Sequence, residues 1–462
     1  MKKLCMNVTL VLLFTFFSGI MADPLYAAKR QEPLIRVGLL SGQPQVLVSA
    51  ESDFMLVAAD SGQKIHTFRA RETVKISMKS QVLTVNDKPI SVRSIQLAFK
   101  DDSRKFRRSS RRNSSANDAL LQQSLTENKK GRFLIVNRHR YRGWIQIKPT
   151  VGQSGLTVIE HLPLEQYVYG VIAKEISTEW PMEAVKAQAV AARNYGLYNV
   201  NKHKNDGYDV CPTVHCQVYG GAGVEKSRGN QAVDETRGQV ITYQGKVIPA
   251  YFHASSGGHT ENSEYVWGSS SPYLKGVPDF DHDQKNFSWK KRISVQALTD
   301  KLSSQGYKVG TLKAIRLSPL KQPSASIDRS LSGRVKTMEF IGSAGTVKVD
   351  GNKLRSMLGL SSTMFDVTLS SSASPGTVIL QKRDIQPGNN RKMAAVKSAP
   401  MLHTVKDSWR DEVIITGFGQ GHGVGLSQWG AKALAEKAGN RRNYYQDILT
   451  YYYQNSKIEK LY

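Results

Sequence analysis

The sequence contains few cysteines, few acidic residues relative to basic ones, and only one long hydrophobic run. Three cysteines occur in 462 residues, and only Cys211 and Cys216 lie outside the N-terminal hydrophobic run. So few cysteines exclude a dense disulfide framework, and the chain must therefore fold by burying apolar side chains. Its length predicts two or three domains.

The hydrophobic run lies at the N-terminus. Lys2 and Lys3 precede the segment LVLLFTFFSGIM, which is too short to span a bilayer comfortably and is followed by small residues. We interpret residues 1–27 as a secretory signal peptide, cleaved after Ala27 or alternatively after Ala22; a retained N-terminal anchor is the competing interpretation. No second hydrophobic span follows. The sequence thus predicts a protein exported to the periplasm or cell wall, with no stable membrane span after cleavage.

Acidic residues are scarce beside basic ones. The chain has 64 Lys and Arg against 38 Asp and Glu, a net charge of +26, and removing residues 1–27 deletes two lysines and one aspartate to leave +25. Such a charge favours an anionic partner, which could be a nucleic acid, membrane head groups or an acidic wall polymer. Because the protein is predicted to be exported, we expect no nucleic-acid partner.

Runs of short β patterns beside a few helical patterns predict an α+β fold. Residues 34–100 predict a β-rich N-terminal region. Residues 101–131 predict a flexible basic loop, since six of the nine residues from 104 to 112 are Lys or Arg; this loop either attracts wall or lipid or only adds solubility. A second flexible insertion is expected at 369–410. It divides a mixed α+β domain into two parts, residues 132–368 and 411–462.

The first helical pattern, LPLEQYVYGVIAKEIS, ends on a carboxylate in an apolar position. Leu164, Val168, Val171 and Ile172 form a stripe at helical spacing, and the next position of that stripe is Glu175. A carboxylate against an apolar wall has a raised pKa and can donate a proton near neutral pH, which is what a general acid requires. Alternatively, the stripe ends before Glu175 and leaves it in water.

The second helical pattern, PMEAVKAQAVAARNYGLYN, has a stripe of small residues. Val185, Ala189 and Ala192 would allow another backbone to approach closely. Gln188 and Arg193 lie on the same predicted helix and could reach a polar ligand, although solvated helix faces often carry such residues.

The stretch HKNDGYDVCPTVHCQVYGG combines two thiols with two imidazoles. The candidate metal ligands are His203, Cys211, His215 and Cys216. They match a structural Zn²⁺ site in chemical type, but the H-x7-C-x3-H-C spacing differs from that of a zinc finger and requires a loop. A Cys211–Cys216 disulfide or two free thiols are the alternatives, and His253 or His259 could replace His203. A zinc hydrolase would need one ligand position open to water.

Near the C-terminus, TGFGQGHGVGLSQWGAK places five alternate glycines around one histidine. The bare backbone suits a bulky ligand such as a glycan ring, and it would equally suit a flat packing surface. The substrate-binding candidates here and in the turn AYFHASSGGHT are Ser255, Ser256, Gly257, His422 and Gln428. A serine nucleophile at Ser255, Ser256 or Ser427 is not favoured, because the sequence offers no recognisable Asp–His partner set.

Five stretches together resemble the stage II sporulation protein D / amidase enhancer LytB family. They occur in that family's order between about residues 133 and 455 and read LPLEQYVYGVIAKEISTEWPMEAVKAQAVAARNY, HCQVYGG, AYFHASSGGHT, SGRVKTMEF and GHGVGLSQWGAKALAEK.

The resemblance implies a peptidoglycan lytic transglycosylase. Such an enzyme cleaves the bond between N-acetylmuramic acid and N-acetylglucosamine and leaves 1,6-anhydro ends, in sporulation-type members on strands whose stem peptides an amidase has removed. The family's catalytic glutamate falls on Glu175. Cys211, His215 and Cys216 match a region that binds zinc in some members, and His203 matches loosely. In amidase enhancer members the domain instead stimulates a cell-wall amidase and need not cut glycan, which is the alternative function.

Overall fold

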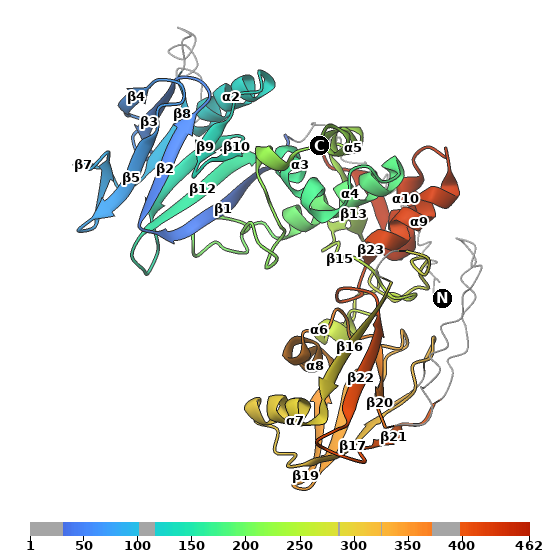
Figure 1. Ribbon diagram of the computed structural model, residues 1–462. Helices are drawn as coiled ribbons and strands as arrows, with labels where there is room; N and C mark the ends of the chain where they lie inside the picture. The colour runs from blue at the N-terminus through green and yellow to red at the C-terminus, as the bar shows by residue number, and fades with distance from the viewer. Residues whose placement is uncertain (1–30, 101–115, 285–286, 325, 372–397) are drawn as a thin grey trace, which may run out of the picture.

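The computed structural model describes residues 31–100, 116–284, 287–324, 326–371 and 398–462. Figure 1 shows an N-terminal part made of sheets, a central group of helices, and a third part made of sheets and helices. The prediction of an α+β fold is confirmed. The predicted signal peptide, residues 1–27, lies outside the described residues. In the described part of the chain, no helix combines the length and apolar character needed to cross a membrane.

The N-terminal part consists of two six-stranded sheets in which every neighbouring pair of strands is antiparallel. The first contains, in order, β1 (Leu34–Gln43), β12 (Leu156–Pro163), β11 (Trp144–Pro149), β8 (Ile95–Phe99), β3 (Phe54–Ala58) and β4 (Lys64–Phe68). The second contains β10 (His139–Tyr141), β9 (Leu134–Val136), β2 (Gln45–Ala50), β5 (Val74–Lys79), β6 (Val82–Val85) and β7 (Lys88–Pro89). Alternate side chains, such as Val46 and Val48 of β2 and Val74 and Ile76 of β5, enter a core shared by both sheets.

This part is longer than the sequence predicted. Strands β9 to β12 complete its sheets, so residues 134–163 belong to it and not to a domain that begins at residue 132. The predicted loop 101–131 is also partly wrong, because helix α2 (Ala116–Lys129) occupies its second half. Leu120 and Leu121 of α2 pack on the outer face of the first sheet. The basic stretch 104–112 lies outside the described residues.

The central part is organised around helix α4 (Met182–Tyr198). This helix contacts α3 (Leu164–Glu175), α5 (Ser227–Glu235), α9 (Gln428–Ala438) and α10 (Tyr444–Tyr452). Its small residues enter two cores: Val185, Ala189 and Ala192 join the core shared with the N-terminal sheets, and Ala184, Ala187 and Ala191 join a core with α9 and α10. The predicted small-residue stripe is thereby confirmed, since four neighbouring helices approach α4 closely.

Short strands close the central part. One sheet contains β14 (Lys246–Val247), β13 (Gln239–Tyr243) and β24 (Lys457–Lys460), and a second pairs β15 (Phe252–His253) with β23 (Leu426–Ser427). Segments far apart in the sequence are thus joined: β15 belongs to the HASSGG turn and β23 precedes α9. The single-turn helices η2 (Ala222–Val224) and α6 (Glu264–Trp267) lie in the connections.

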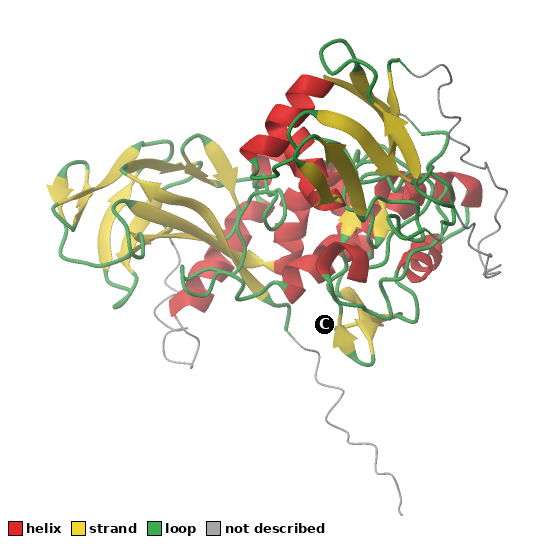
Figure 2. Ribbon diagram, turned by 90° about the horizontal axis from the view of Figure 1, so that it is seen from below, coloured by secondary structure: helices red, strands yellow, loops and turns green. Residues whose placement is uncertain are grey.

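The third part contains two sheets and two helices around one core. The sheets have the orders β16 (Ser288–Ser294), β22 (Glu412–Phe418), β20 (Phe365–Leu369), and β19 (Gly345–Asp350), β18 (Thr337–Gly342), β17 (Leu312–Leu317), β21 (Met401–Thr404). Helices α7 (Val295–Ser304) and α8 (Gly351–Leu358) start at side-chain caps, Ser294 and Asp350. Seen from below, helices separate these sheets from the N-terminal ones (Figure 2).

The predicted insertion 369–410 is only partly described, since residues 372–397 lie outside the described residues. Its last section is not a loop, because β21 pairs with β17 through residues 401–404.

Candidate functional site

Glu175 is the last residue of helix α3. The predicted apolar stripe is confirmed, because Leu164, Val168, Val171 and Ile172 are all buried. The helix ends after Glu175, where Ile176 takes an extended conformation. The carboxyl is only partly exposed, and its burial raises the pKa from the ordinary 4.5 to about 7, although a hydrogen bond with the backbone of Val218 acts in the opposite direction.

Two tyrosines lie within electrostatic reach of this carboxylate. Burial and the negative charges of Cys216, Cys211 and Glu175 raise the pKa of Tyr195 to about 12. The pKa of Tyr167 is raised well above its usual range by burial and by Cys216 and Glu175. Both phenols therefore remain neutral hydrogen-bonding groups beside Glu175 at physiological pH.

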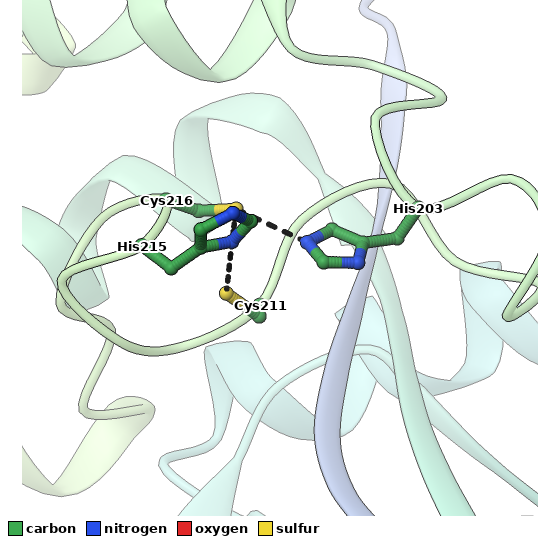
Figure 3. A group of neighbouring side chains, drawn as sticks. All are labelled: His203, Cys211, His215 and Cys216. Atoms are coloured by element: carbon green, nitrogen blue, oxygen red, sulfur yellow. Dashed lines mark hydrogen bonds between the residues drawn. The ribbon is translucent and has the colours of Figure 1, made fainter.

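The four predicted metal ligands meet at one point, with their ligand atoms all within 4.8 Å of one another (Figure 3). Cys216 Sγ lies 3.5 Å from His203 Nε2 and 3.7 Å from His215 Nδ1, and Cys211 Sγ lies 3.6 Å from His215 Nδ1. With Zn–S near 2.3 Å and Zn–N near 2.05 Å, tetrahedral geometry places sulfur and nitrogen about 3.6 Å apart. The cluster thus fits a closed tetrahedral Zn²⁺ site.

The surroundings of the cluster also suit a metal. His203 presents Nε2 to Cys216 while its Nδ1 lies 3.2 Å from a carboxylate oxygen of Asp206, an arrangement that fixes the tautomer of metal-binding histidines. Burial raises the pKa of Cys211, but hydrogen bonds with Thr213, His215 and Cys216 outweigh this effect and leave it at about 7. Both cysteines are free thiols in this structure, which therefore does not contain the alternative disulfide.

The segment directly after Cys216 contacts the end of helix α3 and Glu175. Gln217 accepts a hydrogen bond from the hydroxyl of Tyr167 (3.0 Å), and the backbone of Val218 bonds the Glu175 carboxyl. The loop that carries the thiols is therefore continuous with the segment that positions the carboxyl. A metal bound here would hold in place the segment that bonds Glu175.

Tyr195 belongs to a cluster of partly exposed rings, which we call the aromatic surface. Its members are Tyr195, Tyr251, Phe252, Trp267 and His422. The Tyr195 ring lies 6.0 Å from that of Tyr251 and 6.4 Å from that of Phe252. Trp267, 45% exposed, lies 4.3 Å from Tyr251 and 5.2 Å from His422. Partly exposed aromatic rings offer flat apolar faces with polar edges, as saccharide binding requires.

The predicted binding residue His422 belongs to this aromatic surface. Burial and the nearby Arg334 and Arg355 lower its pKa to about 3, so the imidazole is neutral. Its Nδ1 accepts a hydrogen bond from the Val424 amide at 3.0 Å. The ring also makes a hydrogen bond with the backbone of Phe252, so His422 can offer a ligand its ring face but no charge.

Gln188 and Gln428 also come together, from α4 and α9. Their amide groups are 3.4 Å apart and both side chains are buried. Gln188 Nε2 has no hydrogen-bond partner among the described residues. The neighbouring rings of Trp180 and Trp429 lie 4.6 Å apart. This pair therefore lies beneath the surface, and its predicted contact with substrate remains a prediction.

Arg193 has a structural role. It is completely buried, and its guanidinium donates to both carboxylate oxygens of Glu165, with the shortest contact at 2.6 Å. The same carboxylate accepts from the Gly238 amide and from the Tyr462 hydroxyl. No part of Arg193 is free to meet a ligand, and we no longer include it among the substrate-binding residues. Glu165 is itself buried.

The HASSGG turn is likewise an internal structure. Asp281 accepts hydrogen bonds from the Ser255 hydroxyl (2.6 Å), the Ser256 hydroxyl (3.3 Å) and the Gly257 amide (3.0 Å). Ser255, Ser256 and Gly257 are buried. We therefore assign them to positioning of the turn rather than to direct substrate contact.

The alternate glycines form a packing seam, the second of the two possibilities that the sequence left open. A β-carbon on Gly417 would lie 2.0 Å from the Trp289 ring, and one on Gly423 would lie 2.5 Å from the Arg334 guanidinium. At Gly425 it would meet the Tyr251 carbonyl at 2.1 Å. Glycine is needed because neighbouring atoms occupy the space of a side chain.

Sequence reasoning missed several residues that organise the site. Val218 acts through its backbone, which leaves no mark in residue type. Asp206 and Asp281 lie in loops rich in polar residues and bond partners that the chain brings together only on folding. Trp267 lies in the polar run after HASSGGHT, where the cluster Tyr265, Val266 and Trp267 was the available signal of an apolar surface.

Comparison with known protein families gives matches in two segments of the chain. Residues 152–243, which include Glu175 and all four thiol and imidazole ligands, match the family described as stage II sporulation protein. Residues 268–381 match a domain of unknown function (DUF8618).

Three relatives illustrate the extent of similarity. An uncharacterized protein of Brachyspira hyodysenteriae is 33% identical over 304 residues, 66% of this chain and 68% of that protein. Amidase enhancer of Bacillus subtilis is 34% identical over 305 residues, but these cover only 40% of its length and 63% of this chain. Stage II sporulation protein D of Bacillus amyloliquefaciens is 29% identical over 350 residues, 70% of this chain and 84% of that protein. The chain belongs to the stage II sporulation protein D and amidase enhancer family.

Proposed function

We propose that the protein is an exported peptidoglycan lytic transglycosylase that acts on glycan strands without stem peptides, with Glu175 as general acid and base. The observation that carries this proposal is the position of Glu175: a partly buried carboxyl with a pKa of about 7, at the end of a helix and next to the aromatic surface. At neutral pH such a group is present in both the protonated and the ionised form, so it can give a proton and then take one.

The reaction needs only one carboxylate. Protonated Glu175 donates its proton to the glycosidic oxygen as the bond to C1 of N-acetylmuramic acid breaks. The resulting carboxylate then takes the proton of the C6 hydroxyl of the same sugar, and the C6 oxygen closes onto C1. Ordinary glycosidases use a second carboxylate for a nucleophile or for water activation. Here the attacking C6 hydroxyl belongs to the reacting ring itself and replaces that group. Holding it close to C1 lowers the activation free energy by about 7 kcal/mol or more.

The surroundings of Glu175 suit a sugar polymer. Trp267, Tyr251 and the neutral His422 offer ring faces. The net charge of +26 favours retention on an acidic wall. We further propose that His203, Cys211, His215 and Cys216 hold a structural Zn²⁺. When bound, the metal would fix the loop that leads to Val218 and so keep Glu175 in place.

The test uses purified glycan strands stripped of stem peptides. The mature protein is incubated with these strands beside two variants, Glu175→Gln and Glu179→Gln, and products are analysed by mass spectrometry. Glu179 is a matched control because it is only four residues away and its side chain is 77% exposed. We expect 1,6-anhydro ends from the wild type and from Glu179→Gln, and none from Glu175→Gln. Intact glycan in all three reactions would refute the proposal.

The second candidate function is stimulation of a cell-wall amidase. It is favoured by the 34% identity with the protein named amidase enhancer. The discriminating measurement adds an N-acetylmuramoyl-L-alanine amidase and peptide-bearing peptidoglycan. Release of stem peptides that increases equally with wild type and with Glu175→Gln, in the absence of anhydro products, would favour the enhancer function.

A further inference from the structure

A cavity of about 550 Å³ lies between the N-terminal part and the segment that follows the metal-ligand loop. One side is formed by Ser49 of β2, Ile135 of β9, Arg138 of the turn between β9 and β10, and His139 and Arg140 of β10. The other side is formed by the glycine-rich segment that includes Gly220, Gly223 and Val224. Figure 1 shows β10 next to the central helices.

One side of the cavity is cationic, and the other side leaves space open. Arg138 is exposed, and none of the ion pairs found in the described part of the chain involves it. Arg140 lies 2.8 Å from a Glu51 carboxylate oxygen, so part of its charge is balanced. On the other side, formed by the glycine-rich segment, a β-carbon added to Gly223 would find nothing within 4 Å. The cavity therefore offers a positive charge and unfilled space to a ligand.

Its position connects it to the proposed reacting centre. Gly220 is two residues beyond Val218, the residue whose backbone bonds Glu175. Two residues of extended chain span at most about 7 Å. The Gly220 amide in turn bonds the Gly170 carbonyl of helix α3, the helix that ends at Glu175. The side of the cavity at Gly220 is thus joined to both the segment and the helix that position Glu175.

We propose that this cavity binds the free carboxylate of N-acetylmuramic acid residues in glycan strands that have lost their stem peptides. This inference rests on the proposed function for its substrate. A stem peptide is attached to that carboxylate through an amide, so its removal creates one anion on each muramic acid. The planar guanidinium of Arg138 matches a carboxylate geometrically. The site would therefore let the protein distinguish stripped strands from strands that still carry peptides.

Binding is measured with a chain in which Glu175→Gln prevents turnover, with stripped glycan oligosaccharides as the probe at low ionic strength. Three chemical forms are compared: the free carboxylate, the same oligosaccharide with its carboxylates converted to methylamides, and a peptide-bearing oligosaccharide. Arg138→Gln removes the charge of the cavity. Arg69→Gln removes an equal charge from an exposed position of the same part that does not line the cavity. Gly223→Val fills the space without changing the charge.

We expect Arg138→Gln to weaken binding of the free-carboxylate form about tenfold, the loss of one charged hydrogen-bonding partner, and to leave the methylamide form unaffected. Gly223→Val should also weaken binding, whereas Arg69→Gln should change it less than twofold. Equal effects of Arg138→Gln and Arg69→Gln, or equally tight binding of both forms to the unsubstituted cavity, would overturn the inference. So would preferential, Arg138-dependent binding of a phosphate-bearing wall polymer.

The formation of 1,6-anhydro ends is measured separately with Glu175 intact. If no such ends form but carboxylate-dependent binding is found, the proposed reaction fails and the binding site stands. If ends form but binding ignores the carboxylate, the site fails and the reaction stands.

Discussion

The replacement Glu175→Gln should change how the stability of the protein depends on pH. The folded state raises the pKa of this carboxyl from 4.5 to about 7, because burial disfavours the ionised form. A group whose pKa is raised on folding contributes its full stability below the unfolded value, here 4.5, and loses it as the pH rises through the folded value. The wild type is therefore expected to lose stability between about pH 5 and pH 8, and the glutamine variant is not.

The size of the effect follows from the two pKa values. They differ by about 2.5, and each pKa unit corresponds to about 1.36 kcal/mol, which gives an upper value of about 3 kcal/mol. Because the side chain keeps partial contact with water, which screens its charge, we expect about 2 kcal/mol to be measured. The variant should gain this stability relative to the wild type between pH 5 and pH 9.

The assay is denaturant unfolding of the whole protein at several pH values, with tryptophan fluorescence as the signal. Glu179→Gln is again the control, since its exposed carboxyl should leave the pH dependence of the wild type unchanged. A difference between wild type and Glu175→Gln that is the same at pH 5 and pH 9 would refute the reasoning. In the glycan assay, kcat/KM of the wild type should fall about tenfold per pH unit above pH 7, as the general acid loses its proton.

Three further predictions concern other parts of the structure. Cys216→Ser should lower the zinc content, measured by metal analysis, below one ion per chain. It should also speed amide hydrogen exchange in the peptide that follows residue 216. An unchanged zinc content would contradict the proposed ligand set. Gly430→Ala should destabilise the protein by about 1–3 kcal/mol, because the new β-carbon would lie 1.9 Å from a carboxylate oxygen of Asp279; a thermal midpoint equal to that of the wild type would argue against this packing. Glu165→Gln should cost about 3–5 kcal/mol in denaturant unfolding, because Arg193 would remain buried without its charged partner; a loss below 1 kcal/mol would show that the pair is not essential.

Much of the central part was predictable because its sequence patterns are regular. The stripe from Leu164 to Ile172 has helical spacing, and the structure buries all of it. Helix α2 was not predicted in this way, because its sequence is mostly polar; its apolar residues Leu120, Leu121 and Leu125 pack against the first sheet. The domain boundary was misplaced for a different reason: strand pairing between β1 and β12 joins residues more than a hundred positions apart.

Residue type and spacing predicted which residues come together, but they did not predict which of these residues are exposed. The four candidate thiol and imidazole ligands do meet at one point, and they could be grouped from the sequence because few residues of these types occur in the chain. Arg193, Ser255 and Ser256 were chosen because polar residues often line sites, but each has a buried carboxylate partner that only folding supplies. No sequence pattern distinguishes a polar side chain that meets a ligand from one that meets Glu165 or Asp281.

The packing seam of alternate glycines has a consequence for strand register. At every second position between Gly417 and Gly425, atoms of another segment fill the place of a side chain. A slip of one residue would force Phe418, Gln420, His422 and Val424 into those places, so a misalignment by one residue clashes along the whole stretch. The seam therefore excludes one-residue slips of β22 and of the turn after it, and in this way it keeps His422 on its own side of the chain beside the HASSGG turn.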